Sequence, residues 1–244
     1  MSPDSLSVLR GNDIVINENI IIHQPTLNDI ADIGEQKFFN TFYSLCSIPS
    51  DMKSVLWDVD IDYMKLSDWQ LFIMLSRNYH ADDTGIVFGN LDFASMQPMS
   101  VMGTKEIVLV RDDGMIITEE IYQQFIAYLR MSIGYVVKRE NAANKTTKMF
   151  LIQEDYQRRR MNEGKEYQSI LLPIVLTLVN TEEFSYTYDQ AFDLTIYRLM
   201  RSYFQIQNKK AACALYQGSM SGFVDTSKIK KSSFSWIYDE SKFT

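Results

Sequence analysis

The sequence predicts a mainly α-helical fold: a multi-helix globular body with an N-terminal β-hairpin and a small β insertion at about residues 85–117. Apolar residues recur at spacings of three and four along most of the chain, which indicates amphipathic helices. Runs typical of strands occur in only two places. Glycine and proline are scarce, with 10 Gly and 5 Pro in 244 residues, which argues against long linkers. We therefore expect one domain over residues 1–217 and a C-terminal docking tail at 218–244.

The first elements follow from turn and capping residues. Residues 13–22 are rich in Ile and Val and are interrupted by the polar stretch 17–19, which predicts a strand, a tight turn and a second strand. Thr26 is a good N-cap with Asp29 three places later, a variant of the capping box. The helix behind it is expected to continue until Pro49. Further helices are expected at 50–57, 69–79, 118–133, 146–163, 167–179 and 188–216.

The predicted β insertion rests on short apolar runs. Val87, Phe88, Leu91 and Phe93 indicate a first strand pair. Residues 107–110 and 115–117 indicate two more strands, joined by an Asp-Asp-Gly turn at 112–114. The Met-rich segment 96–102 between them is predicted to be a loop.

The charge and the apolar content of the sequence argue against nucleic acids and membranes as partners. The formal net charge of −7 favours solubility and opposes binding to phosphate backbones, so no nucleic-acid role is expected. The one strong basic cluster, at residues 158–160, alternates with acidic residues and is predicted to be a solvated helix face. The longest apolar run, 170–179, is far shorter than the roughly 20 residues of a membrane span. It predicts a buried helix, and we expect neither membrane insertion nor a secretory signal.

The sequence contains no constellation typical of catalysis. His23 and His80 stand apart from each other and from the cysteines, and Cys46 and Cys213 are expected to be buried free thiols. The alternating acids Asp58, Asp60 and Asp62 could hold Mg²⁺ or Ca²⁺, but the glycine and closing glutamate of a calcium loop are missing. Phosphate-loop, dinucleotide and nucleophile-elbow motifs are also absent from the sequence. We expect a non-enzymatic protein with no catalytic residue, no metal and no cofactor.

Three segments are distinctive: residues 20–30, residues 49–53 with Trp57 behind them, and residues 218–223 followed by 225–229. Together they resemble uncharacterised tail-module proteins of phages and prophages that infect Gram-positive bacteria. The last segment is also similar to the end of some tail assembly chaperones. In those proteins a helix is followed by a small-residue link and a Ser-Lys-Ile sequence, here Ser227-Lys228-Ile229.

The resemblance implies a protein that binds the tape measure or tail tube protein during tail assembly in the host cytoplasm. Large aromatic and arginine side chains are typical interface anchors, so the contacts are expected on the last helix and the tail. The candidate residues are Tyr197, Arg201, Phe204, Phe223, Ile229, Phe234 and Trp236. Phe234 and Trp236 could equally fold back onto their own core.

Three further roles stay open at this point. The chain could be a component retained in the virion tail, or a phage protein that binds a host regulatory or defence partner. It could also be a metal enzyme that uses the Asp58 cluster. The oligomeric state is open too, because rings and open stacks both arise from head-to-tail contacts.

Overall fold

The computed structural model describes residues 4–104, 106–222, 225, 227 and 229–237. In this part of the chain helices dominate, as predicted, and β-structure is limited to a two-stranded hairpin and a three-stranded sheet. The α-helices are α1 (Ser5–Arg10), α2 (Leu27–Ile33), α3 (Glu35–Cys46), α4 (Lys53–Asp58), α5 (Asp68–Leu75), α6 (Ala81–Phe88), α7 (Glu119–Ser132), α8 (Lys145–Asn162), α9 (Leu171–Val179), α10 (Tyr188–Phe192) and α11 (Ile196–Met220). The strands are β1 (Ile14–Asn17), β2 (Ile20–Ile22), β3 (Gln97–Ser100), β4 (Ile107–Val110) and β5 (Ile116–Ile117). Short 3-10 turns include η1 (Pro49–Met52), η3 (Phe93–Ser95) and η5 (Lys231–Phe234).

The body is organised around aromatic side chains from α5, η3 and α7. The ring of Phe72 lies 5.0 Å from that of Tyr122, 5.4 Å from Phe93 and 5.5 Å from Phe125, measured between centroids. These rings pack at steep or tilted angles, which suits their quadrupoles. They form part of one buried cluster that extends from Val8 to residues of α11.

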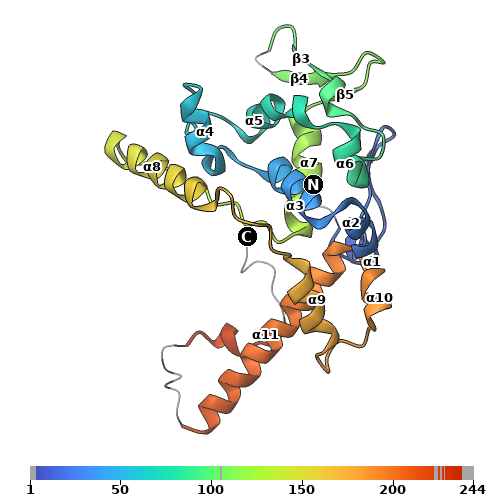
Figure 1. Cartoon of the computed structure of the whole chain (residues 1–244), viewed down its shortest axis with the longest axis vertical. Helices are drawn as coiled ribbons and strands as arrows, with labels where there is room; N and C mark the ends of the chain where they lie inside the picture. The colour runs from blue at the N-terminus through green and yellow to red at the C-terminus, as the bar shows by residue number, and fades with distance from the viewer. Residues whose placement is uncertain (1–3, 105, 223–224, 226, 228, 238–244) are drawn as a thin grey trace.

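Two helices leave this body and extend in different directions (Figure 1). Helix α8 packs against α4 over a small separate cluster of buried residues that includes Leu56 and Ile152. Helix α11 starts in the main core and continues outward, at the end of the molecule opposite the β3–β5 sheet (Figure 1). The described part of the tail returns along α11.

The carboxylate of Glu35, at the start of α3, holds the start of α9. It accepts hydrogen bonds from the backbone N–H of Ile170 at 2.6 Å and of Leu171 at 2.8 Å, and from the Ser169 hydroxyl at 2.5 Å. An anion beside the N–H groups that begin a helix is favoured by hydrogen bonding and by the helix dipole. The last third of the chain is therefore fixed to the body at α9 as well as at α11.

Several predicted starts and turns are confirmed. Thr26 and Asp29 form the capping box at the start of α2, and Thr118 caps α7. The N-terminal hairpin pairs Ile14 with Ile22 in an antiparallel register. The sheet has the order β3-β4-β5, and β4 and β5 lie where the sequence predicts them.

The predicted first strand pair of the β insertion is wrong, because Val87 and Phe88 end the helix α6. The third strand instead comes from the Met-rich segment that was predicted to be a loop, which forms β3 and pairs with β4. Pro98 lies in β3, an edge strand of this sheet, where the missing N–H of a proline is tolerated. The β insertion therefore covers residues 97–117.

Two predicted helices are interrupted. The helix that follows Thr26 is divided into α2 and α3 at Gly34, whose φ of 90° is readily adopted only by glycine. The expected helix 188–216 is divided into α10 and α11, because Thr195 begins a new helix by accepting a hydrogen bond from the N–H of Arg198. This division turns the direction of the chain before α11 leaves the body.

Two predictions of burial also need correction. Helix α9 buries Leu171, Val175 and Leu178, but Leu172 and Leu176 are exposed, so α9 is buried on one face only. Cys46 is buried as expected, whereas Cys213 is exposed because the outer half of α11 has left the core. Within the described residues, no helix combines the length and apolarity that crossing a membrane requires.

Candidate partner-binding surface

The start of α11 is tied to the N-terminal segment of the chain. The Ile196 N–H donates to the carbonyl of Pro25 at 2.9 Å. The guanidinium group of Arg198 donates to the carbonyl of Leu9 at 2.6 Å and also to that of Arg10. These bonds fix the direction in which the rest of α11 projects.

The three candidate residues on α11 lie near this root. Tyr197 is only 2% exposed and belongs to the main core. The Arg201 guanidinium carbon lies 4.9 Å from the centroid of the Tyr197 ring, a cation–π contact. Phe204 packs against Gly134 at the end of α7, where a Cβ on Gly134 would come within 3.2 Å of the Phe204 ring. Tyr197 therefore has a packing role while α11 stays docked, and its predicted contact with a partner remains a prediction.

The described end of the tail, residues 229–237, folds back onto the outer half of α11, and we call this segment the strap. The side-chain amide of Asn208 donates to the carbonyl of Ser235 at 3.1 Å. One turn nearer the body, the amide of Gln205 donates to the carbonyl of Trp236 at 2.8 Å. The strap thus runs antiparallel to α11, and two side chains of the helix bind its backbone.

The candidate residues of the strap differ in exposure. The Phe234 ring is partly buried and meets the Tyr216 ring edge-on, with centroids 5.2 Å apart. Ile229 is also partly buried, whereas the side chain of Trp236 is 56% exposed. Phe223 lies outside the described residues. The structure thus brings Phe234 and the backbone of Trp236 back onto α11 of their own chain, and not onto the main core as the alternative predicted.

The strap covers one stripe of α11, and we call this stripe the strap face. It consists of Gln205, Asn208, Ala212 and Tyr216, which recur at spacings of three and four and therefore share one side of the helix. Ala212 is 1% exposed although its neighbours Ala211 and Cys213 are exposed, so this side of the helix is covered at Ala212. These residues were not among the sequence candidates. Their spacing was visible in the sequence, but polar and small side chains are weak indicators of an interface.

The contacts that hold the strap are individually weak. The neutral hydrogen bonds from Asn208 and Gln205 contribute about 0.5–1.5 kcal/mol each, and the pair of Phe234 and Tyr216 rings contributes a similar amount. Such a segment is expected to open far more easily than the core.

A hollow lies beside the strap, between α11 and the loop that connects α9 and α10. Its volume is about 470 Å³. The lining includes Gln205 and Ile206 of α11 and the aromatic residues Phe184 and Tyr186 of the loop. Since Gln205 also holds the carbonyl of Trp236, an exposed indole and an aromatic hollow lie at the same end of the strap.

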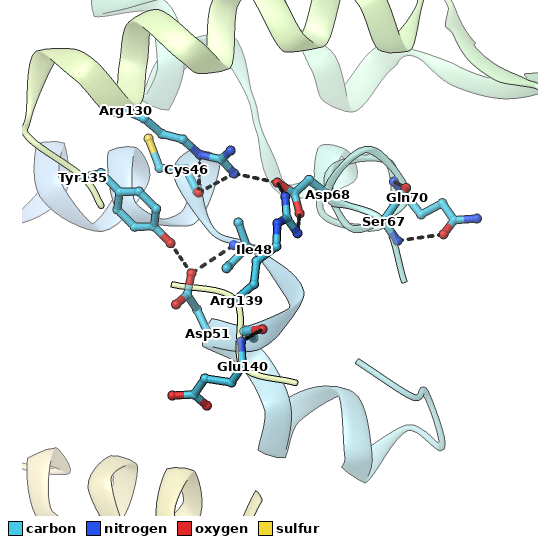
Figure 2. A network of polar contacts seen from close by, with 11 residues as sticks. Cys46, Ile48, Asp51, Ser67, Asp68, Gln70, Arg130, Tyr135, Arg139 and Glu140 are labelled. Atoms are coloured by element: carbon cyan, nitrogen blue, oxygen red, sulfur yellow. Dashed lines mark hydrogen bonds and ion pairs between the residues drawn. The ribbon is translucent and has the colours of Figure 1, made fainter. Parts of the chain in front are cut away.

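A buried polar network organises the other projecting arm by fixing the loop between α7 and α8 (Figure 2). Asp68 is only 5% exposed and receives two hydrogen bonds from Arg139, both of 2.9 Å, and one from Arg130 of 3.1 Å. Arg130 also donates to the carbonyl of Cys46 at 3.0 Å, and the Tyr135 hydroxyl donates to Asp51. Burial raises the pKa of the Cys46 thiol to about 12, so this thiol stays protonated and unreactive.

The basic cluster of α8 lines an open groove of about 1010 Å³ that also includes Asp51, Asp155 and Glu163. Its arginines are partly engaged. Arg158 donates to Asp155 at 2.5 Å, and Arg159 donates to the Ser54 hydroxyl at 3.0 Å. The mixture of charges agrees with a solvated helix face. Among the described residues, no three His, Cys, Asp or Glu side chains converge as metal ligands would.

The contact between Asp155 and Ser54 joins α8 to α4 and makes the arm sensitive to pH. The carboxylate accepts from the Ser54 N–H at 3.0 Å and from its hydroxyl at 2.7 Å. Burial alone would raise the pKa of Asp155, but the hydrogen bonds from Ser54 and Arg158 outweigh it and lower the pKa. The ionised form is therefore favoured in the folded state. Its contribution is complete above the ordinary aspartate pKa of about 4 and is lost as pH falls through the lower folded value.

We expect Asp155→Asn to lower the free energy of unfolding by about 1–3 kcal/mol at pH 7, because hydrogen bonds to a charged group are lost. The difference from the native chain should shrink as the pH is lowered from about 5 to about 3. Urea titrations at several pH values measure both effects. Glu154→Gln, an exposed neighbour on α8, is the control and should show neither effect. A difference that stays constant over this whole range would contradict the assignment.

In a comparison with known protein families, the last third of the chain matches one family model. Residues 160–239 match the model of the YomV second domain, and YomV is a Bacillus prophage protein. The matched range contains α9, α10, α11 and the strap, and it supports a phage or prophage origin. No curated protein and no solved structure matches the chain.

Proposed function

We propose that this chain is a non-enzymatic phage protein of the tail module that binds another tail protein through α11 and the tail. The tape measure protein and the tail tube subunit are the expected partners, and binding would occur in the host cytoplasm during assembly. The observation that most supports the proposal is how the segment that matches the family model, residues 160–239, is arranged in the structure. Its α9 and the start of α11 pack in the core of the body, and the rest of α11 projects outward with an aromatic strap on its surface.

The physical chemistry of the projecting arm is that of an interface. Aromatic side chains supply large contact areas, and here Tyr216 and Trp236 are exposed on the arm. The hollow beside Gln205 offers a place for an apolar side chain of the partner. Leu172 and Leu176 on α9, in the same matched segment, are also exposed apolar side chains.

The proposal is tested by capture of tagged full-length protein from phage-producing cells, with the bound proteins identified by mass spectrometry. We expect the native chain to retain a tail protein, and Trp236→Ala to reduce its recovery at least about tenfold, as for a central aromatic anchor. Phe150→Ala is the matched control: this ring is 67% exposed on α8, the other arm, and its loss should leave recovery unchanged.

The outcomes separate the possible roles. Equal recovery with Trp236→Ala and the native chain would move the site away from the tail. Recovery of a host protein in place of a tail protein would favour the regulatory or defence role. The presence of the chain in purified virions would distinguish a retained tail component from an assembly factor that departs.

A further inference from the structure

We infer that the strap face of α11 is a binding site for an extended segment with an aromatic side chain. The strap, residues 229–237 of the same chain, fills this site and is displaced when a partner binds the tail. This inference deepens the proposed function and rests on it only for the identity of the partner. The binding site itself is defined by the contacts between the strap and α11.

The contacts specify what kind of segment the site accepts. Asn208 and Gln205 donate to two consecutive backbone carbonyls, those of Ser235 and Trp236, and the backbone of Ser235 is extended, with φ −75° and ψ 123°. The edge-on contact with Tyr216 selects an aromatic ring, supplied here by Phe234. Since backbone carbonyls are present in any peptide, the site selects a conformation and one ring, not a long sequence.

The same contacts make Phe234, one of the expected interface anchors, less accessible to a partner. The Phe234 ring packs on Tyr216, whereas Trp236 is exposed in the folded-back state. A partner could meet Trp236 first, but it reaches the whole of Phe234 only after the strap has left α11. The outer half of α11 has few core contacts, so release of the strap does not require the body to unfold.

The strap fills the strap face of its own chain because the two are joined by a short stretch of the same chain. A segment joined to its site through a short link acts at an effective concentration of about millimolar. A free segment, or the tail of a second copy, competes poorly at lower concentrations. The strap therefore stays on its own α11 unless a partner binds the released tail more tightly than α11 does.

A reversible covalent lock tests this inference in the full-length chain. Asn208→Cys and Ser235→Cys place two thiols where the Asn208 side chain already reaches the backbone of the strap. Cys213→Ser removes the exposed native thiol, and the buried Cys46 stays unreactive. Gln207→Cys with Ser235→Cys is the matched control, because Gln207 is exposed and lies off the strap face.

We expect an intramolecular disulfide in the 208–235 variant and little in the 207–235 variant. Non-reducing gel electrophoresis and mass spectrometry of the oxidised chains distinguish the two results. Dimers linked by the disulfide would overturn the inference, because the strap would then belong to a second copy.

Exchange is measured with a fluorescent synthetic peptide of residues 225–237 by anisotropy. The reduced 208–235 variant, whose strap can leave α11, should bind the peptide at least about tenfold more tightly than the oxidised variant, in which the disulfide keeps the strap face filled, when the peptide is titrated to about millimolar concentration. A peptide with Phe234 replaced by Ala should bind weakly to both. Equal binding to the two forms, or no binding to either, would overturn the inference.

The same lock separates this inference from the proposed function. If a tail protein is captured by the reduced variant and at least about tenfold less by the oxidised variant, release of the strap is required for partner binding. If both forms capture it equally, the strap does not need to leave and the inference fails while the proposed function stands. If neither form nor the native chain captures a phage protein, the proposed function fails, and the peptide exchange still decides whether the strap face is a binding site.

Discussion

Asp68→Ala is expected to lower the free energy of unfolding by about 3–5 kcal/mol, because it breaks a buried ion pair and leaves one partner uncompensated. Asp68 is the acceptor on which Arg130 and Arg139 converge (Figure 2). Arg139 is half exposed and can return to water, whereas Arg130 is largely buried and cannot. The loop before α8 would also lose its attachment to α5. Chemical denaturation measures the loss, and hydrogen exchange in α8 should show faster opening of this arm.

A surface ion pair supplies the control for that experiment. Asp83 pairs with Lys37 at 2.8 Å, but both side chains are well exposed. Asp83→Ala should therefore lower the free energy of unfolding by no more than about 1 kcal/mol. Similar losses for Asp68→Ala and Asp83→Ala would show that the network around Asp68 contributes little beyond an ordinary surface pair.

The parts of the fold that depend on neighbouring residues could be predicted from the sequence. The capping box of Thr26 and Asp29, the cap at Thr118 and the turn between β4 and β5 are local interactions with recognisable signals. The wrong predictions of secondary structure lie where contacts between residues distant in sequence determine the conformation. The apolar run at Val87 and Phe88 suits a strand or a buried helix equally, and packing beside Phe93 and Phe125 resolves it as a helix.

The candidate surface was predictable only in part, for a related reason. Large aromatic residues near the C-terminus pointed to the tail, and Phe234 and Trp236 do lie on α11. The side chains that hold the strap there, Asn208 and Gln205, lie 27 and 31 residues before Ser235 and Trp236, whose carbonyls they bind, and they are ordinary residues for a helix surface. Tyr197 has the side chain of a typical interface anchor, but it is buried like a core residue. Only the three-dimensional packing distinguishes these two roles.

Phe125→Ala is expected to be the most damaging substitution in the aromatic core, with a loss of about 3–5 kcal/mol in the free energy of unfolding. Phe125 is fully buried, and its ring lies 5.3–5.5 Å from those of Phe72, Phe88 and Tyr122. Its removal deletes the transfer energy of the ring, leaves a cavity and ends these ring contacts. Phe125→Leu should lose clearly less, because most of the volume is kept. Urea denaturation of the two variants tests the cavity argument, which fails if Leu and Ala cost the same.

The position of this core explains why stability and partner binding should respond to different residues. Phe125 lies on α7, which contacts α11 near its root, whereas the strap face lies farther out. At a temperature where the Phe125→Ala chain is still folded, it should bind the tail peptide and the tail protein as the native chain does. Trp236→Ala should do the opposite, keeping the native midpoint of denaturation and losing the partner. If the core variant loses binding while folded, the arm is coupled to the body through α7, and the strap could not open independently of it.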